Sequence, residues 1–98
     1  MAITELELTQ TQLTRKGRKL RTLDELQGQR MTGAQITCAA IEAEGTEIVF
    51  GYPGGAVIPL YDAIPSSNLH HVLVRFEQWA SLAADGYARA TGEVGVCI

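Results

Sequence analysis

Glu77 is the acidic residue whose position best suits chemistry. It lies in the segment RFEQWASLAADGYARATG, just after an apolar run and just before a small-residue stretch typical of a helix. A carboxylate at that place has two interpretations. It can be an ordinary charge at the partly positive start of a helix, which is the common case. It can also be a buried catalytic acid, which needs burial and a partner that uses its proton.

A second candidate is the glycine-rich loop GYPGG, residues 51–55, which follows the apolar run Ile48-Val49-Phe50. Two adjacent glycines permit unusual backbone angles or the close approach of a ligand. The loop matches neither GxGxxG nor GxxxxGK[ST], so its pattern does not indicate phosphate binding. A plain turn is the alternative interpretation.

The elements that must position these residues alternate along the chain. Thr32 and Gln35 have the spacing of a capping box and predict a helix over 33–44, with an apolar face at Ile36, Ala39, Ala40 and Ala43. Short apolar runs predict buried strands at 48–50 and 72–74, and a third strand starts at 94. Between them we expect a helix from about 56 that Pro65 ends, and a helix over 78–90 that Gly92 stops.

The order helix, strand, helix, strand, helix, strand predicts an α/β fold, an open parallel sheet with flanking helices. Ligands of such sheets lie at the carboxyl ends of the strands. If the two strands are neighbours, the loop 51–55 and Glu77 lie on the same rim. Ala80, Ala83, Ala84, Tyr87 and Ala88 should form the inner face of the last helix, and Asp85 and Arg89 an exposed ion pair. Three strands are few for this fold, so the sequence looks cut short.

The composition narrows the classes of function. The 98 residues carry a net charge of −3, which argues against nucleic acid as the main partner. No apolar run approaches the ~18 residues of a membrane span, and no signal or transit peptide is recognisable, so we expect a cytoplasmic protein without a membrane partner. Residues 1–30 are polar and should form a flexible extension, with the basic cluster 15–21 as a solvated segment. A domain over 31–98 follows.

No metal site is expected from cysteine and histidine. Cys38 and Cys97 both fall in apolar stretches, so both are predicted to be small buried hydrophobic residues. His70 and His71 are adjacent and would point to opposite faces of a strand, where they cannot bind one metal ion together.

Two long segments carry a resemblance to known proteins. They read MTGAQITCAAIEAEGTEIVFGYPGGAVIPLYDAI and HHVLVRFEQWASLAADGYARATGEVGVCI, in one continuous register over about two-thirds of the chain. The region 31–98 resembles the start of the catalytic subunit of the acetolactate synthase (acetohydroxyacid synthase) family. These are thiamine-diphosphate enzymes of branched-chain amino-acid biosynthesis. The resemblance implies a pyrimidine-binding domain of that enzyme type, present only in its N-terminal part.

The resemblance also implies roles for individual residues. Glu77 falls on the family's catalytic glutamate, which hydrogen-bonds a nitrogen of the cofactor's pyrimidine ring and promotes proton removal from the thiazolium carbon. Tyr52, Pro53 and Gly54 match the loop near the cofactor. Gly55 and Ala56 match positions near the substrate entrance. Phe76 and Trp79 depart from the pattern, since the family usually has His and Gly there.

By the same resemblance, the cofactors are thiamine diphosphate, Mg²⁺ and FAD, with the Mg²⁺ ligands in a part of the family's sequence that this chain does not contain. The implied reaction condenses two pyruvates, or pyruvate with 2-oxobutyrate, with loss of CO₂. The implied partners are further copies of the full-length subunit, in a homodimer or higher homo-oligomer, and a regulatory small subunit as a further candidate.

Three hypotheses remain at this stage. The chain is part of an acetolactate synthase catalytic subunit, and inactive by itself. It belongs to another thiamine-diphosphate decarboxylase or carboligase. Or it is a non-catalytic α/β interaction module, which the residues Phe76 and Trp79 favour.

Overall fold

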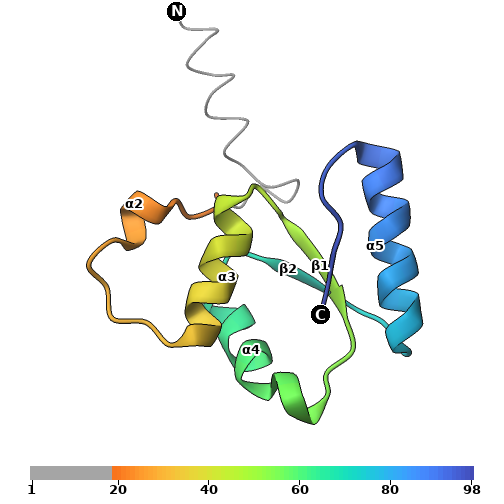
Figure 1. The fold of residues 1–98 in the computed structure, drawn as a ribbon, viewed down its shortest axis with the longest axis horizontal. Helices are drawn as coiled ribbons and strands as arrows, with labels where there is room; N and C mark the ends of the chain where they lie inside the picture. The colour runs from red at the N-terminus through yellow and green to blue at the C-terminus, as the bar shows by residue number, and fades with distance from the viewer. Residues whose placement is uncertain (1–18) are drawn as a thin grey trace, which may run out of the picture.

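A three-stranded parallel sheet forms the centre of the protein (Figure 1). The computed structural model describes residues 19–98. The strand order is β2 (His70–Leu73), β1 (Ile48–Gly51), β3 (Val96–Cys97), and both pairings are parallel. The predicted open parallel sheet with flanking helices is therefore confirmed, and the first two strands are neighbours.

Helices α3 (Gly33–Ala43) and α4 (Ile58–Ala63) lie together on one side of the sheet, and the 3₁₀ turns η1 (Gly55–Val57) and η2 (Ile64–Ser66) flank α4 (Figure 1). The predicted capping box starts α3, because Thr32 and Gln35 each bond the other's backbone amide. The core on this side is small, and its buried members are Cys38, Val49, Ala63, Ile64 and Leu69.

Helix α5 (Glu77–Thr91) covers the other side of the sheet (Figure 1). Ala80 and Ala84 are buried, as predicted for the inner face of this helix. Phe50 reaches α5 and packs edge-on against Tyr87, with the ring centroids 5.9 Å apart. Gly92 ends the helix in the left-handed conformation, with φ of 74°, which glycine adopts without steric cost.

The exposed ion pair predicted on α5 is also present. Arg89 Nε lies 3.1 Å from a carboxylate oxygen of Asp85, one helical turn away. Both side chains are largely exposed to solvent, so this pair contributes little to stability.

The apolar face predicted for α3 is correct only at Ala39, which is buried. Ile36 is 55% exposed and Ala40 and Ala43 are also exposed, whereas Cys38 and Glu42 are buried. The apolar pattern assigned no place to the charged residue Glu42. The structure gives that charge a partner, Arg21, so the carboxylate is tolerated inside and the helix turns a different face to the core.

Two further predictions need correction. Strand β2 starts at His70, two residues before the predicted start, because its backbone pairs with β1 from His70 onward. Nε2 of the next residue, His71, is hydrogen-bonded to the Tyr61 hydroxyl. Cys97 is exposed, not buried. It lies in β3, which is an edge strand of the sheet.

The segment before residue 31 is attached to the domain where the structure describes it. A short helix α2 (Leu23–Leu26) has its own capping box, made by Thr22 and Glu25. Residues 1–18, which include most of the basic cluster, lie outside the described residues. Within the described part of the chain, no helix is both long and apolar enough to cross a membrane.

Candidate functional site

The loop after β1 and the turn after β2 leave the same edge of the sheet (Figure 1). Gly51, the last residue of β1, pairs with Leu73, the last residue of β2. The amide of Val74 donates to the carbonyl oxygen of Gly51 at 3.0 Å, so the segment after β2 remains hydrogen-bonded to β1 for one more residue. The segments that lead to Tyr52 and to Glu77 therefore start from adjacent positions at the carboxyl ends of the two strands, where parallel sheets bind ligands.

Glu77 is the first residue of α5. Its N-cap residue, Phe76, has extended backbone angles and makes no side-chain capping bond. Glu77 itself is exposed, and among residues 19–98 its carboxylate takes part in no hydrogen bond or ion pair. The burial that a catalytic acid needs is thus not supplied by the described residues. The carboxylate is available to a ligand or to another protein surface.

The residues of the loop after β1 are exposed to solvent. Tyr52, Pro53 and Gly54 have no regular secondary structure and are exposed. Gly55 and Ala56 begin the turn η1, which the bond from the Val57 amide to the Gly54 carbonyl closes at 3.1 Å. A Cβ atom added at Gly54 or Gly55 would meet no atom within 4 Å. Packing among the described residues therefore does not explain these two glycines.

Two aromatic rings lie next to Glu77. Phe76 and Trp79 stack edge to face, with centroids 6.0 Å apart, and both are about half exposed. When protonated, the Glu77 carboxyl group can donate a hydrogen bond to a ring nitrogen, which is the bond that an aminopyrimidine ring would accept. The exposed rings of Phe76 and Trp79 add apolar surface beside it.

The expected cofactor also needs a magnesium ion, which requires its own set of ligands. No group of three or more His, Cys, Asp or Glu residues that could hold a metal ion occurs among residues 19–98. Among these residues, Glu77 is therefore the carboxyl group at the candidate site, and no cluster of metal ligands accompanies it.

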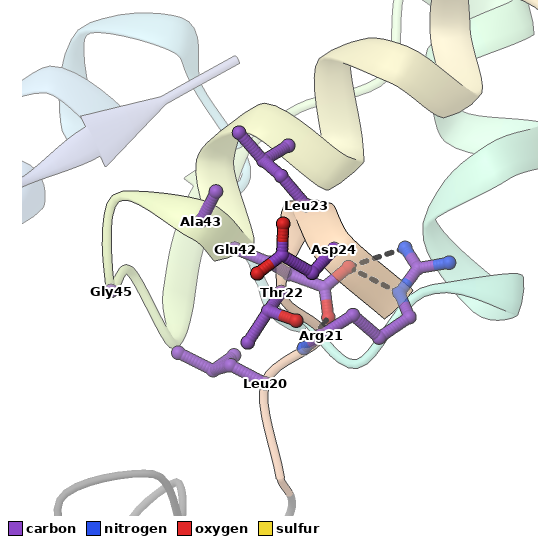
Figure 2. A pocket seen from close by; sticks show the side chains of 8 residues that line it. All are labelled: Leu20, Arg21, Thr22, Leu23, Asp24, Glu42, Ala43 and Gly45. Atoms are coloured by element: carbon purple, nitrogen blue, oxygen red, sulfur yellow. Dashed lines mark hydrogen bonds and ion pairs between the residues drawn. The ribbon is translucent and has the colours of Figure 1, made fainter. Parts of the chain in front are cut away.

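A separate pocket of about 350 Å³ lies at the opposite edge of the sheet (Figure 2). Gly45 contributes to it three residues before β1 begins. Its other lining residues are Leu20, Arg21, Thr22, Leu23, Asp24, Glu42 and Ala43. Sequence reasoning missed this feature, because it is formed by a segment whose composition predicted only a flexible extension.

The polar centre of this pocket is already satisfied. Glu42 accepts bonds from the Arg21 guanidinium, with Nε at 2.8 Å (Figure 2). It also accepts bonds from the backbone amides of Arg21 and Asn68 at 3.2 and 3.3 Å. The hydrogen bond to Glu42 raises the pKa of Arg21. With its acceptor sites taken, Glu42 acts as an anchor for the N-terminal segment and not as a reactive acid.

Comparison with known proteins gives a consistent result. Residues 31–98 match the family described as thiamine pyrophosphate enzyme, N-terminal TPP binding domain. A probable acetolactate synthase large subunit of Methanococcus aeolicus is 62% identical over 68 residues, and that of Methanocaldococcus jannaschii is 59% identical over 68 residues. The acetolactate synthase isozyme 2 large subunit of Escherichia coli is 56% identical over 68 residues.

These matches cover 69% of this chain but only 11–12% of each relative. The matched region is a short part of a much longer protein in each case. It contains β1, β2 and β3, and therefore the whole edge of the sheet that carries Glu77 and the loop 51–55.

Proposed function

This chain belongs to the thiamine pyrophosphate enzyme family, whose N-terminal TPP binding domain it matches over 31–98, and from that premise we propose that it forms the pyrimidine-binding part of an acetolactate synthase large subunit. The single observation that carries the proposal is the position of Glu77. Glu77 is the first residue of α5, which follows the end of the sheet from which the glycine-rich loop also leaves. Among the described residues its carboxylate makes no hydrogen bond or ion pair.

Thiamine diphosphate, when bound, supplies the electron sink that lets a 2-oxo acid lose CO₂. In the proposal, Glu77 holds a proton at a nitrogen of the pyrimidine ring. Tyr52, Pro53 and Gly54 border that ring, and the absence of side chains at Gly54 and Gly55 leaves room for close approach. Gly55 and Ala56 border the path by which pyruvate or 2-oxobutyrate enters.

The exposure of Glu77 sets a condition on this proposal. An acid that exchanges protons with a bound ring works best when water is excluded. We propose that a second subunit covers the sheet edge, in a homodimer or higher homo-oligomer. Mg²⁺ ligands would come from outside the described residues, and FAD, a regulatory small subunit and a cytoplasmic location complete the proposal by resemblance to the family.

Replacement of Glu77 tests the proposal. In the full-length protein, Glu77→Gln keeps the size of the side chain but loses the proton exchange, so acetolactate formation from pyruvate should fall by about 10²–10⁴-fold. Asp85→Asn is the matched control, because it neutralises another exposed acid on the same helix and should leave the rate within about twofold. An unchanged rate in Glu77→Gln rules out the role given to Glu77.

A non-catalytic role has one observation in its favour, the exposed ring pair Phe76 and Trp79 beside Glu77. The two functions differ in ligand binding. Calorimetric titration of the full-length protein with thiamine diphosphate and Mg²⁺ should show saturable binding if the proposal holds. No binding, together with no turnover of pyruvate or another 2-oxo acid, would favour an interaction module.

A further inference from the structure

Three polar groups converge on Gly51, at the point where β1 ends. A Cβ atom placed on this residue would lie 2.6 Å from the carbonyl oxygen of Ile98 and 3.2 Å from Nε2 of His71, and it would overlap the hydroxyl of Tyr61. These groups come from the chain after β3, from β2 and from α4. Gly51 is therefore fixed as glycine by packing, unlike Gly54 and Gly55 in the loop that follows.

Tyr61 and His71 are bonded to each other at this point. The Tyr61 oxygen and His71 Nε2 are 2.9 Å apart, and the two rings meet edge to face with centroids 4.9 Å apart. Burial raises the pKa of Tyr61, and burial and the neighbouring His70 lower the pKa of His71. Both groups are therefore neutral near pH 7, and one hydrogen bond between them satisfies the Tyr61 hydroxyl and His71 Nε2 together.

Tyr61 and His71 lie beside Gly51, the residue immediately before the candidate loop. Gly51 is followed at once by Tyr52, and the carbonyl of Gly51 holds the amide of Val74, three residues before Glu77. Any displacement of Gly51 thus moves both the loop and the turn that leads to Glu77. A larger or differently placed group under Gly51 would change their relative position.

We propose that Tyr61 and His71 are positioning residues for the loop Tyr52–Gly54, and that their hydrogen bond under Gly51 fixes where this loop leaves the sheet relative to Glu77. The inference rests on the proposed function for its meaning, since it is the pyrimidine-contacting loop that the pair would position. Its structural part stands on the contacts at Gly51 alone.

Amide spectra of the ¹⁵N-labelled chain test the inference. Tyr61→Phe removes only the hydroxyl and should shift the amide resonances of Gly51–Gly54 and Val74, with exchange at Val74 about tenfold faster. His71→Leu should produce the same pattern. His71→Gln should restore the wild-type positions, because the amide of glutamine places a bonding group near the position of Nε2.

Tyr87→Phe is the matched control. It also removes one tyrosine hydroxyl bond, to Glu93 at 2.7 Å, but on the α5 side of the sheet. This control should leave Gly51–Gly54 unshifted. Unchanged loop resonances in Tyr61→Phe, or equal shifts in both tyrosine variants, would overturn the inference.

A second measurement covers variants that fold poorly and separates the two proposals. In the full-length protein, His71→Gln and His71→Leu are compared by the KM for thiamine diphosphate, which should rise about tenfold in the leucine variant and return in the glutamine variant while kcat changes little. Equal KM values in the two variants count against positioning. A failure of the proposed function instead appears as an unaffected rate in Glu77→Gln, whatever the loop resonances do.

Discussion

Arg21 and Glu42 form an ion pair that fixes the chain before the family-matched region to helix α3. The Glu42 side chain is completely buried, while the Arg21 side chain keeps 25% of its surface exposed. Asn68 supplies a further backbone amide to the carboxylate, and its side chain bonds the carbonyl of Lys19 at 2.5 Å. Three segments that are distant in the sequence thus meet at one buried charge.

Loss of Arg21 should therefore destabilise the protein strongly. Arg21→Leu leaves the buried carboxylate with only backbone donors, and the free energy of unfolding should fall by about 3 kcal/mol. The double variant Arg21→Leu with Glu42→Leu should recover most of that loss, since no charge then remains buried. Urea unfolding followed by circular dichroism gives both values.

The control for this prediction is the exposed pair in the same segment. Lys19 and Glu25 lie 3.0 Å apart with both side chains about half exposed, so Lys19→Ala should change stability by less than about 1 kcal/mol. If Arg21→Leu costs no more than Lys19→Ala, the segment is not held by Glu42 as described.

This ion pair also shows where prediction from the sequence stops. Thr32 with Gln35 and Gly92 were identified correctly because capping depends on residues within one turn. The burial of Glu42 depends on Arg21, 21 residues away, and a charge in a helical pattern reads as solvent-facing unless its partner is known. The same limit applies to His71, whose partner Tyr61 is on another element.

The candidate site was predictable only in its placement. The strand pattern put the loop 51–55 and Glu77 on one rim, and the pairing of Gly51 with Leu73 confirms that the two connections leave the same edge. The roles of the residues came from resemblance and stay predictions. Local pattern could not distinguish Gly51, which packing requires, from Gly54, which has open space around it.

The close approach of α5 to the sheet makes a second stability prediction. A Cβ atom at Gly95 would overlap the backbone carbonyl of Ala84, which cannot move without shifting the helix. Gly95→Ala should therefore destabilise the protein by about 1–3 kcal/mol. Thermal and urea unfolding of the purified variant measure the loss.

Gly86→Ala is the matched substitution on the same helix. Gly86 lies in the middle of α5 and is exposed to solvent, and a Cβ atom added there meets no atom within 4 Å. Alanine should therefore stabilise the helix by about 0.5–1 kcal/mol. Effects of the same sign at the two glycines would contradict the packing described between α5 and β3.

The lowered pKa of His71 predicts how stability depends on pH. Burial, and then His70, hold the pKa of His71 in the folded protein below its ordinary value of 6.5. Between the folded-state pKa and 6.5, the unfolded chain therefore binds more protons than the native one. Stability contributed by neutral His71 is present above pH 6.5 and is lost as the pH falls below it. The midpoint of urea unfolding should therefore be lower at pH 5.5 than at pH 7.5.

Two variants assign that effect to the residue. His71→Gln cannot titrate and should flatten the dependence below pH 6.5, whereas His70→Gln, which changes only the minor cause, should retain most of it. A dependence that survives unchanged in His71→Gln belongs to other groups.

Trp79 offers a direct report on the candidate site. It is 56% exposed and lies two residues after Glu77, and the difference in emission between the protein and its Trp79→Phe variant isolates its signal. A ring bound at Glu77 would remove water from the indole, so titration of the full-length protein with thiamine diphosphate and Mg²⁺ should shift Trp79 emission to shorter wavelength and saturate. Inorganic diphosphate with Mg²⁺ should leave the emission unchanged, because it lacks the ring. Trp79→Phe should remove the part of the shift that Trp79 contributes, while calorimetric binding persists. Calorimetric binding without any change in Trp79 emission would place the ligand away from Glu77.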